Sequence, residues 1–324
     1  MAFQRIAILS IGEMGYHWAR LLSSRGVEVL SYLKGRSEAT HRRAAEAGVR
    51  LVPTMKQLVA ESDLIVSIVV PFAAPRVAAS LAKTLAQTPK PGVLFLDANA
   101  ISPITAQEID RMLKPAGVSF VDGCIIGGAS KLGRAVIYVS GPEAEKIEGL
   151  EAFGLNVEVL GPDIAQASAF KILYAGLSKG LQALLVELLL GAQKYGLLDE
   201  LVQRYGKSHP GLVDGVGRTI AALTVHGARR AEEMVELVKT LRAKGLRPIM
   251  APATRRVLAS IGALNLGKLS DGGREESLRE VLAVLLENGL LQDGHGPTMT
   301  QERKNFELHH QRGEQTDGEA TKQS

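Results

Sequence analysis

The chain has 324 residues, of which 46% are apolar and 22% are charged, and its formal net charge is +4. This composition is typical of a globular protein of about two domains, and it excludes a fibrous or wholly disordered chain. The basic excess is small and its arginine pairs are scattered, so we expect no nucleic acid partner but a small anionic substrate. A single cysteine, Cys124, excludes an internal disulfide framework and a zinc site built from cysteine pairs.

The first part of the chain alternates β-branched runs with helical segments. Continuous apolar runs such as Ile6–Leu9 and Leu64–Val70 indicate strands buried on both faces. Their alternation with helices predicts an α/β fold over residues 1–162, a Rossmann-type doubly wound parallel sheet. The predicted strands are 6–9, 27–30, 64–70, 93–96, 119–121, 135–139 and 157–160, and the predicted helices are 14–24, 38–47, 74–86 and 105–113.

Strand character ends at Gly161-Pro162-Asp163. Residues 163–294 are predicted to form an all-helical substrate and dimerisation domain, and the polar residues 295–324 a disordered tail. Charged residues interrupt the apolar run of the first helix, so we expect no membrane span there. A strand so near the start leaves no room for a signal peptide, which predicts a cytoplasmic protein. The predicted helices are 163–195, 197–205, 212–224, 230–244, 253–263 and 275–287.

The loop after the first strand has the pattern of a phosphate cradle. A strand–loop–helix context with glycines at this spacing is typical of a dinucleotide-binding loop, with Ser10 at the first glycine position. Gly12 would let the pyrophosphate approach the backbone, Gly15 would let the helix pack closely, and Ser10 suffices if its φ is negative. An ordinary tight turn is the alternative interpretation. The predicted cofactor-binding residues here are Ser10, Ile11, Gly12, Glu13, Met14 and Gly15.

The end of the second strand carries no acidic residue. An Asp or Glu there would bind the ribose hydroxyls of NAD. The segment instead contains Lys34, Arg36 and Ser37, which suit a 2′-phosphate. We therefore predict NADP as the cofactor, with NAD possible and a solvated basic loop as the alternative interpretation.

The long helix combines an apolar surface with a polar stripe. At 3.6 residues per turn the stripe falls on one side of the helix. A buried lysine must be paired or have a shifted pKa, which makes Lys171 a candidate general acid or base. The alternative is that the stripe is the solvated edge of the helix. Its members are Ser168, Lys171, Tyr174, Ser178, Lys179 and Gln182.

Four further segments carry a resemblance to a known family. They are Val70-Pro71 after a strand, Asp97 to Pro103 with Asn99 in it, Asp122 to Gly128, and Lys171 to Tyr174. With the first loop, these motifs resemble the β-hydroxyacid dehydrogenase superfamily, which includes 3-hydroxyisobutyrate and 6-phosphogluconate dehydrogenases. The resemblance covers roughly residues 4–195 and implies a helical C-terminal domain like that of 6-phosphogluconate dehydrogenase.

The resemblance implies roles for individual residues. Val70 and Pro71 would line the cofactor, Asn99 would touch cofactor or substrate, and Gly127 and Gly128 would bind substrate. Lys171 would be the catalytic general acid or base.

The chain also departs from the family pattern. Ile126 replaces a serine, Tyr174 replaces an asparagine, and Ala165 and Ala167 replace glycines. Tyr174 and Ser178 are therefore candidates to bind the substrate in place of the asparagine.

The function predicted from these features is hydride transfer between NADP and a small hydroxy acid by a homodimer. An imine reductase and a non-catalytic NADP-binding module are alternatives, and loss of carbon dioxide after oxidation is a further option. Imine reductases generally lack the lysine, which favours the dehydrogenase. We expect no metal site, because no H-x-x-x-H pattern or carboxylate cluster is present.

Overall fold

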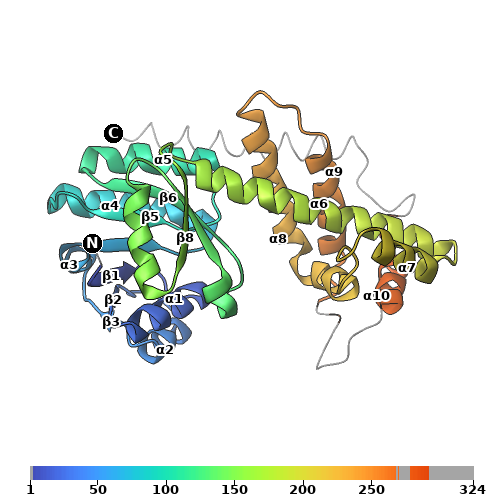
Figure 1. Cartoon of the computed structure of the whole chain (residues 1–324), viewed down its shortest axis with the longest axis horizontal. Helices are drawn as coiled ribbons and strands as arrows, with labels where there is room; N and C mark the ends of the chain where they lie inside the picture. Colours follow the sequence, from blue (N-terminus) through green and yellow to red (C-terminus); the bar gives the residue numbers. More distant parts are fainter. Residues whose placement is uncertain (1–2, 268, 270–277, 292–324) are drawn as a thin grey trace, which may run out of the picture. The chain divides into compact units, whose positions relative to one another are not determined.

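The computed structural model describes residues 3–267, 269 and 278–291 (Figure 1). The chain forms two compact units, the first comprising residues 1–177 and 236–248 and the second residues 178–235 and 249 onward. The predicted tail at 295–324 lies outside the described residues, as does the start of the helix predicted at 275–287.

An eight-stranded sheet runs through the described part of the first unit. Its spatial order is β3-β2-β1-β4-β5-β6-β7-β8, which is a doubly wound arrangement as predicted. The strands are β1 (Arg5–Ile8), β2 (Glu28–Ser31), β3 (Arg50–Leu51), β4 (Leu64–Ser67), β5 (Leu94–Asp97), β6 (Ser119–Ile126), β7 (Val136–Ser140) and β8 (Asn156–Gly161).

One strand runs against the predicted direction. β7 pairs antiparallel with β6, with Cys124 opposite Tyr138, whereas the other neighbouring pairs are parallel. Only a short 3-10 segment, η3 (Ala129–Arg134), joins β6 to β7. A parallel crossover needs a dozen or more residues, so this connection permits only an antiparallel return.

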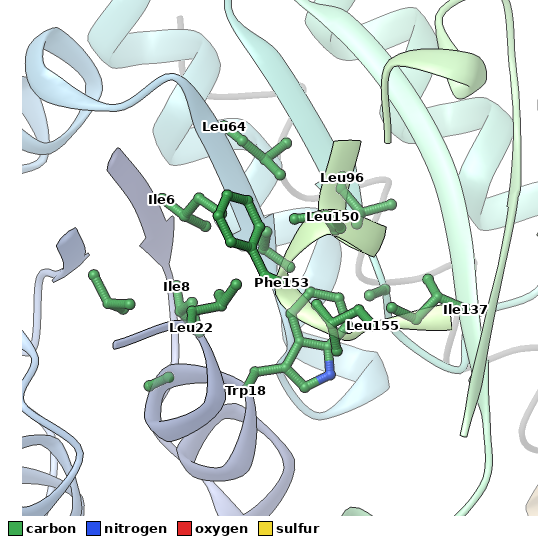
Figure 2. Packing of buried hydrophobic residues seen from close by; sticks show 14 of the residues in the cluster. Ile6, Ile8, Trp18, Leu22, Leu64, Leu96, Ile137, Leu150, Phe153 and Leu155 are labelled. Atoms are coloured by element: carbon green, nitrogen blue, oxygen red, sulfur yellow. The ribbon is translucent and has the colours of Figure 1, made fainter. Parts of the chain in front are cut away.

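Helices cover both faces of the sheet, because alternate residues of each strand point to opposite faces. Ile6 and Ile8 pack on one side with Trp18 and Leu22, whereas Ala7 of the same strand packs on the other side. Figure 2 shows the first of these clusters around the fully buried Trp18. The elements are α1 (Glu13–Ser24), α2 (Glu38–Glu46), α3 (Met55–Glu61), η1 (Pro71–Ala73), α4 (Ala74–Gln87), α5 (Pro103–Leu113), η2 (Lys114–Ala116) and η4 (Ala144–Phe153).

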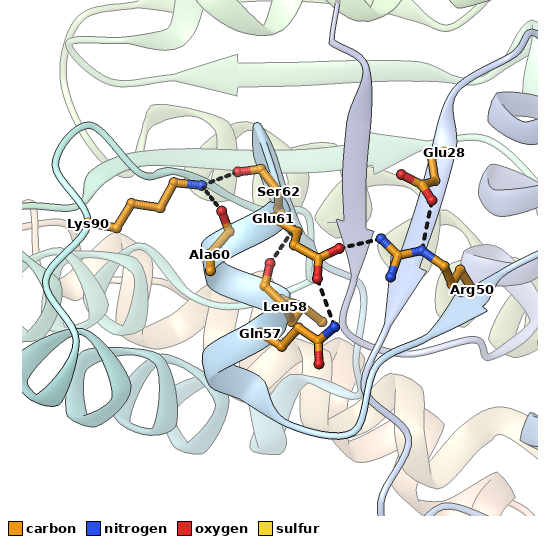
Figure 3. A network of polar contacts seen from close by, with 8 residues as sticks. All are labelled: Glu28, Arg50, Gln57, Leu58, Ala60, Glu61, Ser62 and Lys90. Atoms are coloured by element: carbon orange, nitrogen blue, oxygen red, sulfur yellow. Dashed lines mark hydrogen bonds and ion pairs between the residues drawn. The ribbon is translucent and has the colours of Figure 1, made fainter.

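β3 and α3 were not predicted from the sequence. A polar network holds them at the edge of the sheet (Figure 3). Arg50 of β3 forms ion pairs with Glu28 of β2 and with Glu61 of α3. The Lys90 ammonium donates hydrogen bonds to three backbone carbonyls at the end of α3, those of residues 59, 60 and 62, at 2.7–3.1 Å. β3 is two residues long and exposed, so no apolar pattern marked it.

The remaining described elements are helices, as predicted. α6 and α8 contribute residues to both units, and the boundary between the units lies inside α6 at residue 177. The domain boundary at residue 162 stays a prediction. The first turns of α6 pack on the sheet, which explains why they belong to the first unit. The helices are α6 (Gln166–Lys194), α7 (Leu198–Ser208), α8 (Val216–Arg242), α9 (Met250–Ala263) and α10 (Leu278–Glu287).

α8 is one continuous helix where two were predicted. The predicted break around Gly227 was wrong, because this glycine is a packing residue of the helix interior. A Cβ on Gly227 would lie 2.7 Å from the Leu258 carbonyl oxygen of α9, and one on Gly262 would lie 2.5 Å from the Ala228 nitrogen. The two glycines therefore allow the α8 and α9 backbones to touch.

By length and composition alone, α6 is apolar enough to cross a membrane, with a mean hydropathy of 1.4 over its best 18 residues. One such helix is weak evidence for a membrane, because the core helices of water-soluble proteins pass the same test.

Candidate active site

The loop between β1 and α1 has the geometry of a phosphate cradle. A Cβ on Gly15 would lie 2.1 Å from the Ser10 carbonyl oxygen, so only glycine lets α1 approach the loop this closely. A Cβ on Gly12 would meet only the Ser10 hydroxyl at 3.9 Å, so Gly12 borders open space. Ser10 is not among the described residues with positive φ, which satisfies the condition set for a serine here.

The start of α1 is open to an anion. Gly12 is its N-cap residue and offers no side chain to the first-turn N–H groups. Ser37, Thr54 and Ser102, by contrast, cap α2, α3 and α5 with their hydroxyls. Free N–H groups at the positive end of a helix dipole suit a pyrophosphate. The loop therefore fits a dinucleotide, with Ile11 buried behind it and Glu13 and Met14 in the first helical turn.

This loop lies where the order of the sheet reverses. β1 has β2 on one side and β4 on the other, and the crevice at such a switch point is the usual ligand site. The loop after β4 is at the same edge and exposes Val70 (53%) and Phe72 (72%), with Pro71 between them. An apolar exposed loop at this position suits contact with a flat ring, in line with the predicted role of Val70 and Pro71.

The loop after β2 carries the predicted 2′-phosphate residues. Lys34, Arg36 and Ser37 are all exposed there. Ser37 also caps α2, accepting the Thr40 N–H at 3.4 Å. Within the described part of the chain, neither Lys34 nor Arg36 forms a salt bridge, so both cations are available to a ligand.

The Asn99 side chain bonds to the protein itself and is not exposed as a simple substrate contact would be. Its side chain is buried, and its Oδ1 accepts the Val69 N–H at 2.6 Å. Its Nδ2 donates to Ser67 Oγ and to Asp97 Oδ2, each at 2.9 Å. The side chain thus ties the loop after β4 to the end of β5, and its direct contact with cofactor or substrate stays a prediction.

The Gly127-Gly128 turn follows β6 at the same edge of the sheet. Gly127 has φ +142°, and a Cβ there would lie 2.7 Å from the Ala135 Cα. A Cβ on Gly128 would meet nothing within 4 Å, and both glycines are exposed. The turn therefore presents bare backbone to any substrate that binds there, whereas Ile126 before it is half-buried.

Lys171 of α6 reaches this edge of the sheet. Its Nζ donates a hydrogen bond of 2.7 Å to the carbonyl oxygen of Ile125, near the end of β6. Tyr174, one turn further along the helix, is 55% exposed. Ser178 lies one turn beyond Tyr174 on the same helix, at the start of the second unit, and its contact with a substrate stays a prediction.

The predicted polar stripe on α6 divides between several partners. Lys179 forms an ion pair with Glu233 at 2.6 Å, and Gln182 accepts a hydrogen bond from Arg230 at 2.8 Å. These residues join α6 to α8 within the second unit. The interpretation of the stripe as a solvated edge is therefore wrong for Lys179 and Gln182.

Two buried carboxylates beneath the site were not assigned roles from the sequence. Asp97 and Asp122 are register partners on β5 and β6, and both side chains are fully buried. Burial raises the pKa of Asp97 to about 7, although hydrogen bonds from Asn99 lower it. Burial likewise raises the pKa of Asp122 to about 6 against hydrogen bonds from Ser168, Ser140 and Ala167. In the sequence, the available signal was an acid directly after each of the two strands predicted at 93–96 and 119–121.

Cys124 is a small, fully buried side chain of β6. Burial raises the pKa of its thiol to about 12, so the thiol stays protonated. Among the residues that the structure describes, no group of three His, Cys, Asp or Glu side chains is placed to hold a metal ion.

Two family models match this chain. Residues 5–157 match the NAD binding domain of 6-phosphogluconate dehydrogenase, and residues 192–261 match a domain of unknown function, DUF1932. The chain belongs to the 6-phosphogluconate dehydrogenase-like, or β-hydroxyacid dehydrogenase, superfamily. Its first unit contains an NAD(P)-binding Rossmann domain, and helices follow it.

Several known proteins are similar to this chain. An uncharacterized 28.5 kDa protein of Methanothermus fervidus is 32% identical over 79% of this chain and 98% of its own. A conserved protein of unknown function, reported as structurally similar to 3-hydroxyacid dehydrogenases, is 29% identical over 80% of this chain and 97% of its own, with a TM-score of 0.68. An imine reductase from Myxococcus stipitatus in complex with NAD+ shares the fold at 19% identity over 88% of this chain and 100% of its own, with a TM-score of 0.52.

Proposed function

We propose that the protein is an NADP-dependent oxidoreductase that transfers a hydride between the nicotinamide and a small hydroxy acid. The observation that carries this proposal is the position of Lys171 at the edge of the sheet that also bears the glycine loop. Its Nζ is held at Ile125 O, three residues before the exposed Gly128 backbone. A proton-transfer group thus lies near the exposed backbone of the Gly127-Gly128 turn in an NAD(P)-binding fold.

Each residue of the site has its own role in the proposed reaction. When bound, a nicotinamide would supply hydride transfer at the carbinol carbon, and the loop from Ser10 to Gly15 would hold the pyrophosphate of the cofactor. The neutral Lys171 amine takes the hydroxyl proton during oxidation, and the ammonium returns it during reduction. The exposed Gly127-Gly128 backbone binds the polar groups of the substrate, and Tyr174, one turn from Lys171, closes the other side. Ile126 in place of a serine favours an acid with an apolar substituent.

Two lysines of α6 provide a matched test of this role. Lys171→Met removes the amine while keeping most of the side-chain volume, and we expect kcat to fall about 10²- to 10⁴-fold on a panel of four- to six-carbon hydroxy acids. Lys179→Met is the control, because Lys179 pairs with Glu233, and Arg229 still pairs with Glu233 at 2.7 Å after the change. Equal activity of wild type and Lys171→Met would refute the role of Lys171.

NADP is favoured over NAD by the basic loop after β2. Lys34 and Arg36 are exposed cations without an acidic neighbour in that loop, and a 2′-phosphate accepts charge-assisted hydrogen bonds from both. We propose that these two residues discriminate between the cofactors.

Two observations support imine reduction as the alternative function. The fold is shared with an imine reductase along nearly the whole described chain, and Tyr174 replaces the family asparagine. Reduction of cyclic imines that survives Lys171→Met would favour this function. NADPH binding without turnover of any hydroxy acid or imine would instead favour the non-catalytic module.

We propose that the protein is a homodimer formed along α6. Leucines at spacings of three and four residues are exposed on this helix, including Leu177 at 69%. Such spacing is typical of a helix that packs against another helix. Leu177→Glu is expected to give monomers in light scattering, and Leu51→Glu, at an exposed leucine of β3, is expected not to. A monomeric wild type would contradict this proposal. The exposed leucines are Leu173, Leu177, Leu181, Leu184 and Leu188.

A further inference from the structure

The first turn of α6 has no cap of its own. Ala165 precedes the helix, has no polar side chain and adopts φ +81°. The N–H groups of the first turn therefore need acceptors from elsewhere. The sheet supplies them, because Ser140 Oγ of β7 accepts the Ala167 N–H at 3.0 Å and Asp122 Oδ2 of β6 accepts the Ser168 N–H at 2.8 Å.

The Asp122 carboxylate is used on both of its oxygens. Besides the Ser168 N–H, it accepts the Ser168 hydroxyl on Oδ1 at 2.6 Å and the Ser140 hydroxyl on Oδ2 at 3.3 Å. Asp122, Ser140 and Ser168 are all fully buried. A carboxylate at the N-terminus of a helix is also stabilised by the helix dipole. This is a dry, fully bonded attachment of α6 to the sheet.

A second attachment lies three residues further along each element. Asp122 and Ile125 are three residues apart on β6, and Ser168 and Lys171 are three residues apart on α6. Residues i and i+3 of a helix lie on the same face. One face of α6 therefore touches one strand at two points, Ser168 with Asp122 and Lys171 with Ile125.

We propose that Asp122 is the positioning residue of Lys171: its buried carboxylate fixes α6 on β6 and so holds the lysine amine at the end of that strand. Two points are needed to fix both the rotation of α6 and its position along its axis. Without the Asp122 contact, the first turn of α6 keeps the Ser140 bond to the Ala167 N–H, but it loses the carboxylate that bonds both the backbone and the side chain of Ser168. Asp122 itself touches neither substrate nor cofactor in this account, which rests on the proposed function of Lys171.

The first test measures the position of Lys171 without measuring turnover. Each lysine is labelled with an amine-reactive ester, and the rate is read by peptide mass spectrometry. In Asp122→Asn, which loses an ionised acceptor, we expect Lys171 to label several-fold faster. Lys90, which is anchored to three carbonyls in the same unit, is the internal control and should keep its rate. Asp97→Asn is the matched variant, because Asp97 is equally buried and bonds to Asn99, not to α6.

The labelling rates of Lys171 and Lys90 either support the positioning role of Asp122 or overturn it. Faster labelling of Lys171 alone in Asp122→Asn, and not in Asp97→Asn, supports positioning. Unchanged labelling of Lys171, or an equal increase at Lys90, overturns it, the second result showing a merely structural role. If Asp122→Asn does not fold, Ser168→Ala removes only the 2.6 Å hydroxyl contact and is read in the same way.

The second test separates this inference from the proposed function. For an active enzyme, Asp122→Asn should lower kcat about tenfold or more through misplacement of the amine, with the Kd for NADPH unchanged. A weakened Kd with unchanged kcat would overturn the inference. If Lys171→Met is fully active, the proposed function fails, yet the labelling rates still decide whether Asp122 positions Lys171.

Discussion

Ser10 and Gly15 approach each other so closely that a Cβ on residue 15 would lie 2.1 Å from the Ser10 carbonyl oxygen. Gly12, in the same loop, has open space where its Cβ would be. The two glycines therefore serve different purposes, one for packing and one for the ligand.

Alanine substitutions separate these purposes. Gly15→Ala should destabilise the apoprotein by about 1–3 kcal/mol, because the clash is with backbone. Gly12→Ala should change apoprotein stability by about 1 kcal/mol or less but weaken NADPH binding about tenfold or more by blocking the pyrophosphate. Chemical unfolding and calorimetric titration measure the two effects. Full NADPH affinity in Gly12→Ala would show that the loop does not bind the pyrophosphate.

Cofactor choice should depend on Lys34 and Arg36. The double variant Lys34→Ala, Arg36→Ala is expected to weaken NADPH binding about tenfold or more, because each cation contributes a charge-assisted hydrogen bond worth about 1.5 kcal/mol or more. NADH lacks the 2′-phosphate, so its Kd should stay the same. Equal losses for both nucleotides, measured by titration, would contradict the assignment of this loop to the 2′-phosphate.

Asp97 should make stability depend on pH. Burial raises its folded-state pKa to about 7 from an ordinary value of 3.8, so between these values the folded state holds a proton that the unfolded state has released. Stability from this group is therefore fully present below about pH 4 and is lost as pH rises to about 7. Asp97→Asn should reduce the fall in the free energy of unfolding between pH 4 and 8, as measured by chemical unfolding at each pH. Glu108→Gln, at an exposed site on α5, is the control, and an unchanged slope in Asp97→Asn would contradict burial of an ionisable carboxylate.

Ala165 should tolerate glycine but not a branched side chain. Its φ of +81° lies in the left-handed region, where a Cβ costs about 1–2 kcal/mol. Ala165→Gly should stay within about 1 kcal/mol of wild type, because relief of strain offsets the lost methyl group and the greater entropy of the unfolded chain. Ala165→Val should cost about 2 kcal/mol or more. Equal stability of the valine and wild-type proteins in thermal unfolding would show that residue 165 is not held at positive φ.

Gly227 should be required where α8 meets α9. Gly227→Ala places a Cβ 2.7 Å from a backbone oxygen, and we expect a loss of about 1–3 kcal/mol despite the better helix propensity of alanine. Gly206→Ala on α7 is the matched control, because its Cβ would meet Val213 at an ordinary 3.8 Å, and a gain of up to about 1 kcal/mol is expected. A gain in both variants would contradict close packing of the two helices.

Local sequence patterns predicted the parts of this molecule that depend on local chemistry. The spacing of Gly12 and Gly15 after a strand predicted the cradle, and the alternation of segments predicted the sheet. The direction of β7 depends on the length of the η3 connection, and a strand pattern carries no direction. Gly227 has the local signature of a helix end, and only contact with α9 explains why it lies inside a helix.

The buried polar groups were the hardest part to predict. Asp97 is the last residue of β5 and Asp122 lies in the middle of β6, although an acid after an apolar run usually begins a loop. Their importance comes from partners far away in sequence, such as Ser168, which is 46 residues from Asp122. Lys171 was found from the apolar helix around it, but its hydrogen bond to Ile125 is a property of the fold.

Thermal unfolding with added ligands tests the central claim most directly. The wild-type protein is melted alone, with NADP(H), with NAD(H), and with each nucleotide together with four- to six-carbon hydroxy acids. We predict that NADP(H) raises Tm more than NAD(H) does, and that an acid raises it further only when the nucleotide is present. Failure of both nucleotides to raise Tm would show that the loop from Ser10 to Gly15 binds no dinucleotide, and the account of this protein as an oxidoreductase would be wrong.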